Sequence, residues 1–126
     1  KYSGDFDTAQ RCYERALTLA LAHFGPDHPE VATLYHNLGG LAHARGDFAC
    51  GEPLARRAVE IRELALGPEH PDVLADRVAW AGLLDGLQRF DESEPIYRHA
   101  LDFYEALGFL CVGMERDLRS VKAAPW

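Results

Sequence analysis

The chain has 126 residues, of which 48% are hydrophobic and 26% are charged, and its formal net charge is −7. This composition is typical of one soluble globular domain. The negative balance disfavours nucleic acid and anionic membranes as partners, because both attract a positive field. No apolar run approaches the roughly 18 residues that cross a bilayer, and no signal peptide opens the chain.

Cysteine usage indicates a reducing compartment. The chain has three cysteines, Cys12, Cys50 and Cys111, an odd number. They are widely spaced and form no CxxC motif. We therefore expect a cytoplasmic protein. The chain opens on Lys1 rather than Met, so we expect a fragment or a trimmed product.

The first predicted helix covers residues 8–24. Its apolar or small residues recur every three or four positions, as on one face of a helix, at Ala9, Cys12, Tyr13, Ala16, Leu17 and Ala20. The same spacing predicts further helices at residues 31–44, 49–66, 73–87 and 91–107. Gly46-Asp47 forms the turn between two of them, with Asp47 as a helix N-cap. Pro53 and Pro95 fall inside predicted helices, where we expect a local bend.

The connectors between the predicted helix pairs reveal a repeat. GPDHPEV starts at Gly25 and its near-copy GPEHPDV starts at Gly67, 42 residues later. Residues 25–66 can be laid over residues 67–108, with matching glycines, prolines and apolar positions along their length. A fixed period of this length is the signature of a repeat architecture.

The histidine of each connector has a structural and a chemical interpretation. Gly25 can end a helix in the left-handed conformation, and Pro29 suits a first helical position. His28 and His70 would then lie near helix N-caps, and we favour this role over metal binding or catalysis. A metal site would need further ligands from elsewhere in the fold.

Other candidate chemistry is sparse. His36 and His43 lie two turns apart on one helix face and could form half of a metal site, but no third ligand lies in the same helix. Cys50, near a helix start, is either a thiol with a lowered pKa or a small packing residue. No nucleophile, phosphate-binding or paired-carboxylate motif is found. We expect no cofactor, no metal and no catalysis.

The pattern resembles the tetratricopeptide repeat. Gly46-x-Phe48 marks the turn within a repeat, and Ala9, Tyr13 and Ala16 match the small–aromatic–small pattern of the second helix. The 42-residue period and the segment LGPEHPDV at residues 66–73 resemble the kinesin-light-chain variety. The resemblance implies an all-α, right-handed α-solenoid of antiparallel helix pairs.

The resemblance also implies a division of the chain and a core. We expect one domain over residues 1–126, with a partial repeat at 1–24, repeats at 25–66 and 67–108, and a capping helix at about 112–123. The expected core residues are Tyr13, Leu17, Leu38, Phe48, Ala58, Trp80, Phe90, Tyr97, Ala100 and Leu101.

In this family the first helices line a concave groove that binds partner segments, often through paired asparagines. Only Asn37 matches that pair here, because His36 takes the other place and Val78 and Ala79 stand one repeat later. Carrying the register along the chain gives these groove residues: Thr33, His36, Asn37, Gly40, His43, Ala75, Val78, Gly82, Asp85, Arg116 and Arg119.

The predicted function is a protein–protein interaction scaffold. We expect an extended partner with an apolar or aromatic residue near Gly40 and Gly82 and an acidic residue near Arg116 and Arg119. Two alternatives stay open. One is a regulatory arm excised from a larger enzyme or signalling switch. The other is self-association through the solenoid ends, because residues 1–4 would lie at an exposed apolar end.

Overall fold

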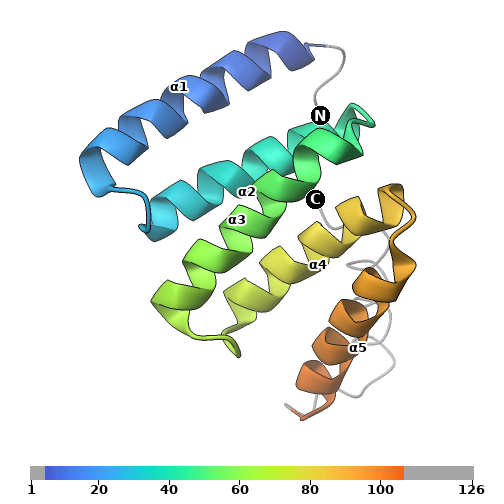
Figure 1. The fold of residues 1–126 in the computed structure, drawn as a ribbon. Helices are drawn as coiled ribbons and strands as arrows, with labels where there is room; N and C mark the ends of the chain where they lie inside the picture. Colours follow the sequence, from blue (N-terminus) through green and yellow to red (C-terminus); the bar gives the residue numbers. More distant parts are fainter. Residues whose placement is uncertain (1–4, 107–126) are drawn as a thin grey trace.

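The computed structural model describes residues 5–106, and these residues form helices and connecting turns without a strand. Successive helices run antiparallel, and each packs against its neighbours along the chain (Figure 1). The predicted all-α solenoid of helix pairs is therefore confirmed. The helices are α1 (Phe6–Phe24), α2 (Pro29–Ala44), α3 (Phe48–Leu66), α4 (Pro71–Gly86) and α5 (Phe90–Ala106).

Both histidine-proline connectors are built in the same way. The Nδ1 atom of His28 accepts a hydrogen bond from the backbone N–H of Glu30 at 3.1 Å, and His70 accepts one from Asp72 at 3.0 Å. Each histidine is thus the N-cap of the following helix, and a proline is the first residue of that helix. The structural interpretation of the two histidines is confirmed.

The two turns within the helix pairs share a left-handed backbone conformation but place different residues in it. Gly46, between α2 and α3, has a φ of +77°, and Gln88 has a φ of +60° at the position 42 residues later. A glycine adopts this left-handed conformation at little cost, whereas a glutamine is strained in it. Asp47 follows the first turn at the N-cap position of α3, but its side chain makes no capping hydrogen bond.

The helices meet through small residues and a layer of aliphatic side chains. A Cβ atom on Gly51 of α3 would lie 2.7 Å from Leu83 of α4 and 2.9 Å from Ala42 of α2. Only glycine permits this approach of three helices. Pro53 lies inside α3 and Pro95 inside α5, and both helices continue past them.

The expected core is partly confirmed. Leu38, Ala58, Tyr97 and Ala100 are buried. Four further members are half-buried, namely Tyr13, Leu17, Phe48 and Trp80.

The prediction was wrong for Phe90, which is 56% exposed, and for Leu101, which is 39% exposed. Phe48, the counterpart of Phe90 one period earlier, lies against Gly86 near the end of the following first helix. Among residues 5–106 no helix follows α5, so Phe90 and Leu101 have no such surface to cover them. The predicted capping helix at 112–123, the expected apolar end at residues 1–4, Arg116 and Arg119 lie outside the described residues.

Candidate functional site

The predicted groove residues of the described chain lie on α2 and α4 and differ in accessibility. Thr33 and Ala75 are exposed. Half-buried side chains are those of His36, Asn37, His43 and Asp85, whereas Gly40, Val78 and Gly82 are buried.

A cluster of four polar side chains joins α2 and α4, the first helices of the two pairs. We call it the Asp76 cluster; its members are Thr33, His36, Arg62 and Asp76. The carboxylate of Asp76 on α4 accepts a hydrogen bond from Nε of Arg62 on α3 at 2.5 Å and lies 3.3 Å from Nδ1 of His36 on α2. Arg62 also donates to the hydroxyl of Thr33 at 3.1 Å. The Asp76 side chain is 7% exposed and that of Arg62 is 14% exposed, so three helices are tied together around a carboxylate largely shielded from water.

Asn37 lies next to this cluster and differs from its members. Its side-chain amide makes no hydrogen bond or ion pair with another described residue, and no polar side-chain atom in the described chain is buried without a partner. The amide is therefore accessible and retains both its donors and its acceptor. Because Thr33, one turn before Asn37, and His36, directly before it, are held by the Asp76 cluster, the helix that presents Asn37 is fixed in place.

The burial of Val78, Gly40 and Gly82 corrects the expectation that they line an open surface. Val78 is 5% exposed and belongs to a core cluster with Ala81, Tyr97 and Ala100. It contributes to the packing of α4 on α5, because its side chain lies where the two helices meet. Gly40 and Gly82 are buried within α2 and α4, so we no longer count them as positions for close ligand approach.

Asp85 on α4 forms hydrogen bonds that attach α5. Its carboxylate accepts hydrogen bonds from the hydroxyl of Ser93 at 2.5 Å and from that of Tyr97 at 2.9 Å. Burial and the nearby Asp85 carboxylate raise the pKa of the Tyr97 hydroxyl well above its usual range, so Tyr97 remains a hydrogen-bond donor. His43 faces the ring of Phe48 edge-on, and burial lowers the pKa of its imidazole. These residues stabilise the fold around the site.

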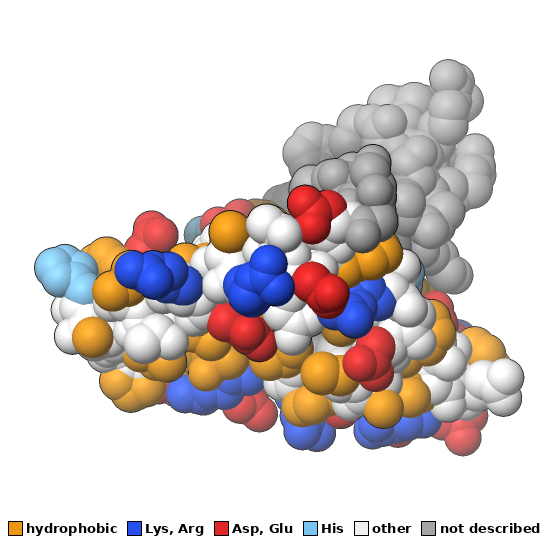
Figure 2. Space-filling model, turned by 90° about the horizontal axis from the view of Figure 1, so that it is seen from above, with side chains coloured by type: hydrophobic (Ala, Val, Ile, Leu, Met, Phe, Trp, Pro, Cys, Tyr) orange, Lys and Arg blue, Asp and Glu red, His pale blue; other side chains and the backbone are white. Residues whose placement is uncertain are grey.

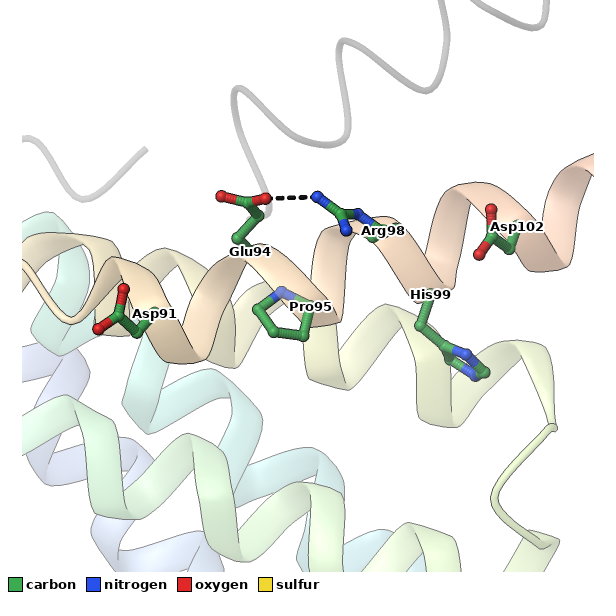
Figure 3. A pocket seen from close by; sticks show the side chains of 6 residues that line it. All are labelled: Asp91, Glu94, Pro95, Arg98, His99 and Asp102. Atoms are coloured by element: carbon green, nitrogen blue, oxygen red, sulfur yellow. Dashed lines mark hydrogen bonds and ion pairs between the residues drawn. The ribbon is translucent and has the colours of Figure 1, made fainter.

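The described residues contain no group of three side chains suited to a metal ion. His36 instead faces Asp76, and His43 faces Phe48. One hollow lies along α5 (Figure 3), but three of its polar side chains are already paired: Glu94 and Arg98 with each other, and His99 with Glu69. The hollow is lined by Asp91, Glu94, Pro95, Arg98, His99 and Asp102. None of the five described helices is long and apolar enough to cross a membrane.

Sequence reasoning missed Arg62 and Asp76, which organise the site. The signal was a break in the repeat: Ala20 precedes Arg62 by one period, and Leu34 precedes Asp76 by one period. Two positions that are apolar one period earlier thus carry opposite charges, one in each repeat. A second shielded carboxylate, Glu52, is 6% exposed; it pairs with Arg56 at 3.6 Å and accepts a hydrogen bond from the indole N–H of Trp80 at 2.9 Å.

Comparison with protein families agrees with this architecture. Two models of the tetratricopeptide repeat match the chain, one over residues 1–50 and one over residues 31–72. Together they cover more than half of the sequence, and the chain belongs to the tetratricopeptide repeat family. Comparison with curated proteins gives no match. Tetratricopeptide repeats form protein–protein interaction scaffolds and are generally not catalytic, so this chain is a scaffold of that general kind.

Proposed function

We propose that the chain binds an extended segment of a partner protein along the concave side formed by α2 and α4, and that it catalyses no reaction. The observation that carries this proposal is the Asn37 amide, which is accessible and unpaired among the described residues. An amide can donate to and accept from a peptide backbone at once. An extended backbone offers both groups, because its N–H and C=O groups are not used within the segment itself.

The surroundings of Asn37 support binding without rearrangement. Arg62 and Asp76 fix α2 against α4, so little conformational entropy is lost when a ligand binds. Thr33 and Ala75 add exposed side chains on the same two helices. Since Gly40 and Gly82 are buried, we no longer propose an aromatic ligand residue beside them. An acidic ligand residue near Arg116 and Arg119 remains part of the proposal, because arginine suits carboxylates.

A peptide library displayed on phage and selected against the protein tests this proposal. Selected peptides should bind the Asn37→Ala, Arg119→Glu double variant at least tenfold more weakly, which corresponds to about 1.4 kcal/mol. Cys50→Ala, an exposed change on α3, is the matched control and should leave affinity unchanged. Peptides that bind the double variant as tightly as the parent would place the site on another face.

The compartment and the repeat variety are also proposals. Cys12 and Cys50 are free, exposed thiols in the structure, which supports a reducing and therefore cytoplasmic setting. The second family match spans residues 31–72, the same length as the 42-residue period, and supports the kinesin-light-chain-like variety.

Exposed apolar side chains on α5 favour a second function, self-association through the solenoid ends. Phe90 and Leu101 are both exposed on this last described helix. Light scattering over a concentration series distinguishes assembly from binding by a monomer. A regulatory arm of a larger enzyme or switch would be recognised by a catalytic domain in the same open reading frame.

A further inference from the structure

Arg62 has an unused donor beside the surface that presents Asn37. Its Nε atom donates to Asp76 at 2.5 Å, and its Nη2 atom donates to the hydroxyl of Thr33 at 3.1 Å. Its Nη1 atom makes no hydrogen bond or ion pair with another described residue, and no polar side-chain atom in the described chain is buried without a partner. Nη1 is therefore accessible to solvent, and its N–H groups are free to bind a ligand.

Contacts with two other helices fix where this nitrogen lies. Arg62 reaches from α3 to Thr33, which is exposed near the start of α2. Thr33 and Asn37 are one turn apart on α2, about 6 Å along the helix axis. An extended peptide spans that distance with about two residues. A ligand whose backbone binds Asn37 would thus bring a side chain about two residues away to Arg62.

The chemistry of Arg62 favours an acidic ligand residue at that place. A guanidinium group binds a carboxylate through charge-assisted hydrogen bonds, which are stronger than neutral ones. The protein as a whole does not attract acids, because its net charge is −7 and Figure 2 shows basic and acidic side chains intermixed on the face seen from above. Asp76 also offsets part of the charge on Arg62. Recognition of an acid would therefore depend on direct contact with Nη1 rather than on long-range attraction.

We propose that Arg62 is a specificity-determining residue of the groove, a role that rests on the proposed function because it needs a segment bound there. It selects a partner segment with Asp or Glu about two residues from the position that Asn37 binds. It also adds a residue of α3, the second helix of its pair, to a surface otherwise formed by α2 and α4. The acid bound by Arg62 is distinct from the one proposed near Arg116 and Arg119.

A library of random peptides displayed on phage is the probe. It is selected in parallel on the 126-residue protein and on the Arg62→Ala, Asp76→Leu double variant, which removes both charges of the buried pair. We expect Asp or Glu to be enriched at one position of the peptides selected by the parent, but not of those selected by the double variant. Glu63→Ala with Arg77→Ala is the matched control, because it removes the neighbouring ion pair of the same two helices; it should keep the enrichment.

Synthetic peptides then distinguish direct contact from a change in the shape of the groove. The tightest peptide from the parent selection is compared with an analogue that carries the corresponding amide, Gln for Glu or Asn for Asp. We expect the amide peptide to bind the parent about fivefold more weakly, the upper end of the range for exposed ion pairs. The double variant should bind both peptides equally, whereas a mere change of shape would weaken both by the same factor. Circular dichroism checks that each variant is folded.

The experiment separates the failure of this role from the failure of the groove. A library that yields no binder, or peptides that bind Asn37→Ala as tightly as the parent, would refute the groove and the role of Arg62 with it. Peptides that need Asn37 but contain no enriched acid would overturn the role of Arg62 alone. An equal amide penalty on the parent and on the double variant would also overturn it, and the acid would be assigned to Arg119 if Arg119→Glu abolished that penalty.

Discussion

Removing the carboxylate of Asp76 tests the central interaction of the structure. Asp76→Leu restores the residue that stands one period earlier, Leu34, but it leaves Arg62 without its main partner. Arg62 is only 14% exposed, and its remaining described hydrogen bond is to the neutral hydroxyl of Thr33. Breaking one side of a buried ion pair costs about 3–5 kcal/mol, and the residual exposure of Arg62 places the expected loss near about 3 kcal/mol.

The double variant gives the opposite expectation. Arg62→Ala together with Asp76→Leu installs the residues found at Ala20 and Leu34, so that no unpaired charge remains. Buried ion pairs replaced by apolar residues are often neutral or stabilising by about 1–4 kcal/mol. We therefore expect the double variant to recover to within about 1 kcal/mol of the parent, although each single change is destabilising.

Urea denaturation followed by far-ultraviolet circular dichroism measures these free energies of unfolding. An unchanged dependence of the free energy on urea concentration would show that the same surface is exposed in each variant. A loss below about 0.5 kcal/mol for Asp76→Leu, the usual range of surface substitutions, would refute the reasoning. Strictly additive single effects would do so as well, because they would mean that the two side chains do not interact.

Two further predictions concern individual contacts. Trp80→Phe keeps an aromatic ring but removes the donor to the buried Glu52, so we expect a loss of about 1–3 kcal/mol in urea denaturation. An equal loss for Trp80→Phe in a Glu52→Leu background, where no acceptor remains, would show that the hydrogen bond contributes nothing. Gln88→Gly should raise the thermal midpoint by relieving a left-handed backbone worth about 1 kcal/mol. Gly46→Gln, the reciprocal change, should lower the midpoint, and the same sign for both variants would contradict the strain argument.

The sequence was sufficient for the elements that repeat. The histidine-proline connectors could be predicted because glycine, proline and an N-cap each act on the adjacent backbone, and His28 and His70 confirm this reasoning. Apolar spacing predicted the helices but placed the starts of α2 and α4 two residues too late, because both begin at the connector prolines, which suit a first helical position.

The site could be predicted less well, because its side chains depend on neighbours from other helices. A helical register places Val78 on α4 but does not tell which flank α5 covers. Likewise Arg62 and Asp76 are 14 residues apart and meet only after α3 and α4 have packed. Phe90 and Leu101 were misjudged for a related reason, since burial at the last described helix depends on a further helix to cover it.

Because the helices are stacked one after another, they are not expected to unfold together. Each described helix is held chiefly by its neighbours along the chain, so cooperativity passes from one helix to the next rather than through a common centre. α1 buries no residue and is attached through one face, whereas α4 buries nine positions between its neighbours. Backbone amides should therefore exchange with solvent soonest in α1 and latest in α4. We expect α1 to separate from its neighbour while the central helices stay packed against each other.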